Sequence, residues 1–397
     1  MAFDRTRDDV RSTGPQAAAR ASGLSALETA VGLPFDVVEP EHSAPVHADG
    51  DPFRALRSAM LPALRSGPCL VAFSGGLDSS LVLAAATSAA RDEGLRPPLP
   101  VTLRFRASGA TEEQEYQERV VAHLGLTDWD IVTLEDDLDL VGPVAQRHLL
   151  RHGVLFPSNC HAMVPLIERA RGGTLMTGHG GDHLMCLWPG AHLAEVLARR
   201  VAARPRDGLR LAAALAPRAV RRTWLGYARP PVPRPWLTPD AAVAYRRTTI
   251  DLATRRARTW ASWLDEQPRL RRLRVGVETY DRLGADHGAR VQHPLLDRGF
   301  VASLGRLGGR WGAGDRNRIL ATIAGEALPA ALVARTTKAI FDAAFVTPTS
   351  LTFAERWDGR GLDTEVVDPE RVRAAWTDAN PYPAALLLQA AWLADHG

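Results

Sequence analysis

The chain has 397 residues, 46% of them hydrophobic, which is enough to bury a large core in one domain or in two closely joined domains. No apolar run approaches the roughly 20 residues that span a bilayer, and the polar N-terminus lacks the apolar stretch of a signal peptide, so we expect a cytoplasmic protein without membrane contact. The three cysteines have no metal-ligand spacing and form no even set for disulfides. Cys69, Cys160 and Cys186 are predicted to be small buried side chains.

The formal net charge of +3 is modest, but the arginines crowd one stretch, residues 199–274. Such a stretch could attract nucleic acid or an acidic peptide. Few aromatic side chains that could stack on bases lie among these arginines, which favours the alternative of a solvated face on long helices. We therefore do not expect nucleic acid as a partner.

Lysine is almost absent from the chain. Of 48 lysine and arginine residues, Lys338 is the only lysine, so the other 47 are arginine. A single lysine in such a background indicates a place that needs a compact point charge with three donors, which a planar guanidinium cannot imitate.

The spacing of apolar residues predicts strands and helices in alternation. Residues 1–50 are rich in Ala, Pro, Asp and Gly and are predicted to be an extension with one short helix near 24–31. Helices are predicted at 53–64, 81–91, 112–124 and 164–171, and strands at 69–73, 101–105, 129–134 and 174–177. This alternation predicts a parallel sheet whose ligands bind at the carboxyl ends of the strands. Beyond about residue 190 the pattern is mostly helical, interrupted by prolines between 230 and 235.

The strongest motif is the loop between the strand at 69–73 and the helix that follows it. It reads Ser74-Gly75-Gly76-Leu77-Asp78-Ser79-Ser80. The glycines let the backbone approach an anion closely, while the serine hydroxyls and the helix N-terminus supply donors and a positive dipole. The loop is predicted to cradle a pyrophosphate. It lacks the Lys-Ser/Thr ending of the Walker loop, so a kinase or GTPase that acts on the γ-phosphate is not favoured.

From about Asp51 to Lys338 the chain resembles the PP-loop ATP pyrophosphatases, and among them the synthetase domain of asparagine synthetase, β-lactam synthetase and the lasso-peptide cyclases. Four further segments carry the resemblance: Glu112-Glu113 with Tyr116 and 121–125; Thr177-Gly178-His179-Gly180-Gly181-Asp182; the block from Asp281-Arg282 through His287-Gly288 to Pro294-Leu295-Leu296-Asp297; and Arg335-Thr336-Thr337-Lys338 with Phe341. The lone lysine thus falls on the catalytic lysine of the family.

The resemblance implies an α/β fold with a parallel-sheet PP-loop core, similar to the adenine nucleotide alpha hydrolases, followed by a largely helical C-terminal half. It divides the chain into an N-terminal extension (1–50), the nucleotide-binding core (51–190), an Arg-rich helical insertion (191–274) and the helical C-terminal part of the synthetase domain (275–397). The carboxylates that would hold Mg²⁺ are Asp78 and Asp182, since magnesium needs hard oxygen ligands and bridges phosphates.

The same resemblance implies the chemistry. A substrate carboxylate attacks the α-phosphorus of ATP, pyrophosphate leaves, and an amine then displaces AMP from the acyl-adenylate to form an amide. Lys338 would stabilise the developing charge, with Arg335 in the same block. The residues that would bind the nucleotide are Ser74, Gly75, Gly76, Asp78, Ser79, Ser80, Gly178 and Gly180.

The residue at the position of the base for the second step differs from those of the relatives. Asparagine synthetase has Glu at the position of His179, and β-lactam synthetase has Tyr there, paired with a later Glu. In a gap-free comparison of the third block that Glu position is Arg290. Histidine is a credible base near neutral pH, whereas arginine is not. His179 is therefore the candidate base, with His183 and His293 as possible substitutes.

The nitrogen source is the second departure. Glutamine-dependent relatives carry an N-terminal glutaminase domain of about 200 residues, but only about 50 residues precede the synthetase block here. The resemblance thus implies a small-molecule or peptide carboxylate as substrate and an amine or ammonia as acceptor, the ammonia possibly from a separate amidotransferase.

Two other functions stay open at this stage. Some PP-loop proteins adenylate tRNA bases, and the segment 199–274 could bind RNA, although the cysteine pair or zinc site typical of that route is not visible. Alternatively the chain is a nucleotide-binding protein that has lost the second half-reaction, which Arg290 would support.

Overall fold

The computed structural model describes residues 23–40, 50–105, 111–134, 138–186, 188–228, 231–335, 345–378 and 382–397. Within them a five-stranded parallel sheet has the order β3-β2-β1-β4-β5. Its strands are β1 (Cys69–Ala72), β2 (Leu99–Phe105), β3 (Asp130–Leu134), β4 (Thr174–Met176) and β5 (Arg290–Gln292). The predicted α/β class with a parallel sheet is confirmed.

β5 was not predicted, because it lies in the part of the sequence that was expected to be helical. It has three residues, of which Val291 is the buried one, so it carries too few apolar positions for a periodic signal. The strand exists because Leu175 of β4 pairs with Val291 at the edge of the sheet.

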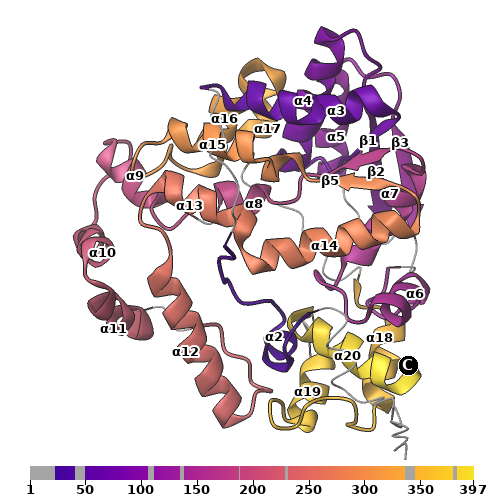
Figure 1. Cartoon of the computed structure of the whole chain (residues 1–397), viewed down its shortest axis with the longest axis vertical. Helices are drawn as coiled ribbons and strands as arrows, with labels where there is room; N and C mark the ends of the chain where they lie inside the picture. Colours follow the sequence, from indigo (N-terminus) through magenta and orange to yellow (C-terminus); the bar gives the residue numbers. More distant parts are fainter. Residues whose placement is uncertain are drawn as a thin grey trace, which may run out of the picture.

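Side chains on the two faces of the sheet enter two separate cores. Val71, Phe73 and Met176 lie in a core with the helices α3, α4, α13, α15 and α16. Leu70, Leu175 and Val291 lie in the other core, which contains α6, α7, α14 and α20. Successive residues of a strand point to opposite faces, so the sheet is covered by helices on both sides, as Figure 1 shows.

Two helices of the first half, α2 and α3, begin at side chains that cap them. α3 (Pro52–Ser66) starts with a proline, and the Asp51 carboxylate accepts from the amides of Phe53 and Arg54. The other helices there are α2 (Ala26–Val31), α4 (Leu77–Asp92), α5 (Thr111–His123), α6 (Pro143–His152), η1 (Cys160–Met163), α7 (Val164–Arg169), α8 (Gly181–Met185) and α9 (Ala191–Leu197).

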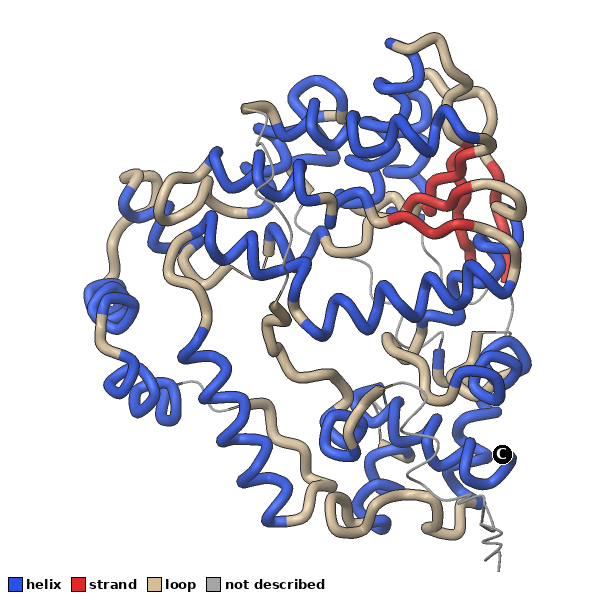
Figure 2. Tube along the Cα trace, in the orientation of Figure 1, coloured by secondary structure: helices blue, strands red, loops and turns tan. Residues whose placement is uncertain are grey.

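The rest of the described chain is almost wholly helical, as predicted. Its helices are α10 (Pro205–Leu215), α11 (Arg218–Ala228), α12 (Pro239–Arg255), α13 (Trp260–Glu266), η2 (Gln267–Arg269), α14 (Arg271–Asp286), η3 (Pro294–Leu296), α15 (Arg298–Leu307), α16 (Arg316–Ala324), η4 (Gly325–Ala327), α17 (Ala330–Val333), α18 (Pro348–Arg356), α19 (Pro369–Trp376), η6 (Tyr382–Ala384) and α20 (Ala385–His396). Figure 2 shows the strands gathered on one side and α10, α11 and α12 on the opposite side of the molecule. No described helix combines the length and the apolar content that a membrane crossing needs.

The described part of the N-terminal extension is built into the fold. The short helix predicted near 24–31 is α2. Ala30 and Val31 of this helix, and Leu24 just before it, are buried in the same core as α20. The strand-like residue Val38 then forms a bridge with Leu270 at the start of α14. The segment therefore ties the C-terminal helices to the Arg-rich region.

Candidate functional site

The loop after β1 is held in one shape by its own hydroxyl groups. Ser79 Oγ and Ser80 Oγ both donate to the Gly76 carbonyl, at 3.0 and 2.8 Å, and the Ser74 amide donates to Ser79 Oγ at 3.3 Å. Gly75 has φ +82°, the left-handed region that favours glycine. Gly76 is the N-cap of α4 and has no side chain to cap the first amides of that helix. The loop therefore presents helix N–H donors suited to an anion.

The loop after β4 packs directly on the first one, because β1 and β4 are neighbours in the sheet. A Cβ on Gly178 would lie 2.8 Å from the Ser79 amide nitrogen, and a Cβ on Gly181 would lie 2.5 and 2.6 Å from the two carboxylate oxygens of Asp78. Gly180 has φ +93°, and a Cβ there would lie 2.7 Å from Leu296 Cγ. Gly178 and Gly181 are thus required by the close approach of the two loops, and Gly180 by its positive φ and by its contact with Leu296.

A cation connects the two carboxylates that were predicted to hold magnesium. Arg316, in the first turn of α16, has Nη2 2.8 Å from Asp78 Oδ2 and Nη1 3.3 Å from Asp182 Oδ1. The two acids therefore converge on one point, and their oxygens on adjacent loops beside helix N–H donors are a donor set that suits Mg²⁺ shared with phosphate. No local motif distinguishes Arg316 from the other arginines of the chain.

Arg335 lies beside the first loop and is held there by Glu113 of α5. Its guanidinium forms two hydrogen bonds with the Glu113 carboxylate and lies over the Tyr116 ring, 4.4 Å from the ring centroid. Both charged side chains are nearly buried. Glu113 also borders Gly75, since a Cβ there would lie 3.3 Å from the Glu113 carbonyl oxygen. Arg335 is the last described residue before 336–344, so Lys338 lies outside the described residues.

Three rings meet at the carboxyl ends of β4 and β5. The centroid of His179 lies 5.1 Å from that of His293 and 5.4 Å from that of Tyr280, and Tyr280 lies 5.4 Å from His293. Thr177 Oγ1 joins them, at 2.7 Å from His293 Nδ1 and 3.1 Å from the His179 amide nitrogen. Among the described residues no group hydrogen-bonds Nε2 of His179 or of His293, both of which are buried.

Burial controls the protonation of these histidines. It lowers the pKa of His179 to about 4, with the Asp182 charge opposing the shift, and the pKa of His293 to about 3, with His179 adding to it. Burial likewise lowers the pKa of His183 to about 3, with the Arg272 charge adding to it. All three imidazoles are therefore neutral at pH 7, the form that can accept a proton.

The comparisons with known proteins agree with this arrangement. The model of the asparagine synthase family matches residues 54–394 of the 397. The chain belongs to the asparagine synthase family. Members of that family are ATP-dependent, amide-forming ligases, and the matched segment holds both loops, Asp78, Asp182 and His179. No curated protein matches the chain.

Arg290 does not lie near the candidate base in this asparagine synthase family member. It is exposed at the amino end of β5, opposite Thr174 at the amino end of β4, whereas His179 follows the carboxyl end of β4. In the gap-free comparison of the third block, Arg290 stood at the position of the glutamate that assists the base in β-lactam synthetase. In the structure, this position does not lie beside His179. The aromatic partner that the structure supplies is Tyr280, which sequence reasoning missed although it directly precedes the Asp281-Arg282 motif.

The other predicted residues divide between the site and its surroundings. His183 lies 3.3 Å from Arg272, Nδ1 to Nη2, and is not part of the three-ring group. Cys186 is exposed, so its predicted burial was wrong; its Sγ is 3.5 Å from Asp182 Oδ1, and partial burial raises the pKa of the thiol to about 11. Cys160 is buried and Cys69 is partly buried.

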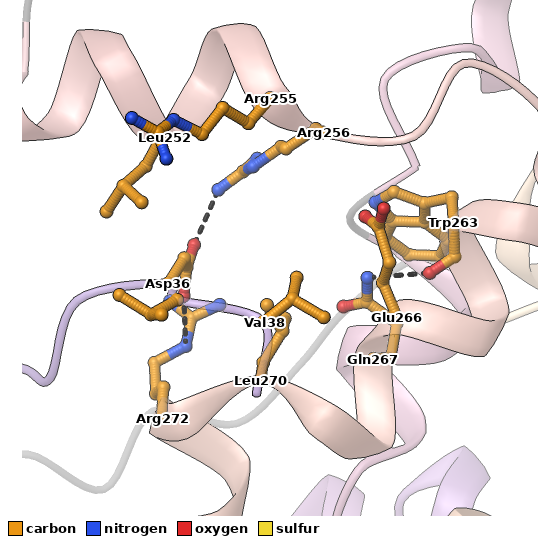
Figure 3. Close-up of a pocket in the computed structure, with 11 residues that line it drawn as sticks. Asp36, Val38, Leu252, Arg255, Arg256, Trp263, Glu266, Gln267, Leu270 and Arg272 are labelled. Carbon is orange, nitrogen blue, oxygen red and sulfur yellow. Dashed lines mark hydrogen bonds and ion pairs between the residues drawn. The ribbon is translucent and has the colours of Figure 1, made fainter. Parts of the chain in front are cut away.

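A cavity of about 410 Å³ is lined in part by Arg272, whose guanidinium lies 3.3 Å from His183 of α8. Its walls come from the N-terminal segment, the end of α12, α13 and the start of α14, and Figure 3 shows Asp36 between Arg256 and Arg272. Leu252, Trp263 and Leu270 add apolar surface. The cavity therefore combines a charged side with an apolar side next to the candidate site.

Proposed function

We propose that this asparagine synthase family member adenylates a substrate carboxylate with ATP and then joins it to an amine. The observation that carries the proposal is the convergence of Asp78 and Asp182 on one point beside the uncapped N-terminus of α4. That arrangement supplies helix N–H donors for phosphate oxygens and two carboxylates that would hold Mg²⁺, which supplies charge neutralisation between phosphates when bound.

In the first step a carboxylate oxygen attacks the α-phosphorus of ATP, and the bond from that phosphorus to the oxygen bridging to the β-phosphate breaks. The products are the acyl-adenylate and pyrophosphate. Amides of α4 bind the phosphates, the hydroxyls of Ser79 and Ser80 hold the first loop in shape, and Lys338 stabilises the charge on the phosphorus in this proposal. The buried pair of Arg335 and Glu113 holds Arg335, which is three residues before Lys338 in the sequence, beside the loop.

In the second step the amine attacks the acyl carbon, AMP leaves, and the amine loses a proton. We assign the role of proton acceptor to His179 because its ring lies beside the second loop and its Nε2 has no hydrogen-bond partner among the described residues. The acceptor is an amine within a substrate or ammonia, including ammonia from a separate amidotransferase.

Product analysis tests the reaction. Incubation with ATP, Mg²⁺, candidate acids and amines should yield AMP and pyrophosphate, whereas release of ADP would refute the proposal. K338R should abolish turnover while ATP still binds, because the guanidinium keeps the charge but not the compact geometry. Retained turnover in K338R would count against the role given to Lys338.

The cavity beside Arg272 is proposed to receive the part of the substrate beyond its reacting carboxylate. L252W would fill part of its apolar wall, so the KM for the acid should rise several-fold while kcat stays near the wild-type value. V243W, on an exposed part of α12, is the matched control and should change neither constant. An unchanged KM in L252W would exclude the cavity as the substrate pocket.

RNA modification has less support. Many arginines of the segment 199–274 are paired with acids, for example Arg218 with Asp251, Arg256 with Asp36 and Arg274 with Glu39. Paired guanidinium groups are poor phosphate contacts, so we expect no RNA binding that weakens steeply with salt. A steep salt dependence would revive this alternative.

A further inference from the structure

Four side chains with metal-binding atoms meet where the last turn of α6 touches the end of α14, away from the nucleotide loops. They are His148 and His152 of α6, Asp286 at the last position of α14, and His287 just after it. Their side chains are 7, 17, 7 and 14% exposed, respectively. Nothing in the proposed reaction uses this cluster.

Two ring nitrogens of the cluster have no hydrogen-bond partner among the described residues. His152 Nε2 lies 2.6 Å from Asp286 Oδ2, and His148 Nδ1 lies 3.5 Å from the same oxygen. His148 Nδ1 and His287 Nε2 are buried, and no described residue hydrogen-bonds either atom. Buried polar atoms without a partner are rare in folded proteins and ask for an explanation such as a ligand.

We propose that His148, His152 and Asp286 bind a divalent transition-metal ion of the zinc class. Their three ligand atoms all lie within 4.8 Å of one another. Ligands about 2.1 Å from a tetrahedral ion are roughly 3.3 Å apart, so small side-chain movements bring the three atoms onto one ion. His148 and His152 are four residues apart on one helix, the spacing with which two histidines share a zinc ion on a helix face.

A fourth ligand and an outer shell are also present. The rings of His148 and His287 are 5.4 Å apart, which places His287, with its buried Nε2, beside the three ligands as the fourth ligand of this proposal. His287 Nδ1 lies 3.4 Å from Glu168 Oε1, and Asp286 Oδ1 lies 3.0 Å from Arg151 Nη2. Such contacts to the far side of a ligand are what orients metal-binding histidines and carboxylates.

The burial of the cluster assigns it a structural role, since catalytic zinc sites keep an open position for water or substrate. The ion would join the end of α6 to the end of α14. Asp286 lies six residues beyond Tyr280, about 9 Å along the helix at 1.5 Å per residue. The bound metal would therefore fix the helix that holds Tyr280 against His179. The proposal of this metal site does not depend on the proposed reaction.

Metal analysis of the full-length, untagged protein tests the proposal. After dialysis against a chelator, the protein should take up about one equivalent of Zn²⁺ in the presence of millimolar Mg²⁺, and Co²⁺ in its place should give the strong visible absorption of a tetrahedral site. The added Zn²⁺ should raise Tm by about 5 °C, because an ion that binds the folded state alone stabilises it. Wild-type protein that takes up no Zn²⁺ and shows no shift would overturn the proposal.

Three variants locate the ion. H152Q should lose the Co²⁺ absorption and the Tm shift, while H123Q, which changes an exposed histidine outside the cluster, should keep both. D182N should also keep both, which excludes the nucleotide site as the place of binding. If D182N loses the absorption and H152Q keeps it, the ion binds at the nucleotide site and the proposal is wrong.

Discussion

Gly181 offers the sharpest test of how the two loops depend on each other. In G181A the new Cβ would lie 2.5 and 2.6 Å from the carboxylate oxygens of Asp78, about 1 Å closer than ordinary nonbonded contact of about 3.5 Å. Asp78 is 15% exposed and bonded to Arg316, so it has little room to move away. The carboxylate must therefore leave its position opposite Asp182.

Two magnitudes follow from this displacement. Overpacking in a buried site typically costs about 1–3 kcal/mol, so the free energy of unfolding should fall by that amount. Displacement of the Asp78 carboxylate should reduce the rate of ATP-dependent pyrophosphate release by at least about 10²-fold. A shift of about 1 Å in a group that positions the reactants lowers the reaction rate by that factor. Urea denaturation followed by tryptophan fluorescence measures the first quantity, and pyrophosphate release in saturating Mg²⁺ measures the second.

Gly208 supplies the matched control. It lies in α10, has no positive φ, and a Cβ there would meet no atom within 4 Å. G208A should therefore raise helix stability by about 0.5–1 kcal/mol and leave pyrophosphate release unchanged. Wild-type pyrophosphate release by G181A would show that the geometry described for Asp78 and the second loop is not needed for activity.

Three further predictions use other parts of the site. E113Q should destabilise the protein by about 3–5 kcal/mol in urea denaturation, because it removes the negative charge from the buried ion pair with Arg335, whereas E115Q on the exposed face of α5 should cost less than about 1 kcal/mol; equal small losses would contradict the buried pair. Stability should fall as pH drops from about 6.5 toward 4, because the folded pKa of His179 is about 4 and those of His183 and His293 are about 3, so the unfolded state binds more protons in this window; the change is on the order of 3 kcal/mol for each of these histidines, and a flat profile between these pH values would refute it. H179Q should keep ATP-dependent pyrophosphate release but slow amide formation by about 10²–10⁴-fold at pH 7, measured by separate assays of the two products, and an unimpaired amide rate would assign the base elsewhere.

The sequence by itself predicted the α/β class, four of the five described strands and both glycine loops. These features are local: a buried strand reads as a short apolar run, and a loop that approaches a phosphate needs glycine and small hydroxyl side chains at consecutive positions. Asp78 and Asp182 were identified for the same reason, since each belongs to a motif that is contiguous in the chain.

Only the tertiary structure decided which distant residues complete the site. Arg316 joins the two carboxylates but stands in no local pattern that distinguishes it from other arginines, and Tyr280, which faces His179, adjoins a recognised motif without belonging to it. Arg290, by contrast, stood in an informative motif and proved to lie at the wrong end of its strand. Proximity between segments depends on how the strands are ordered in the sheet and how helices cross it, which residue spacing along the chain does not encode.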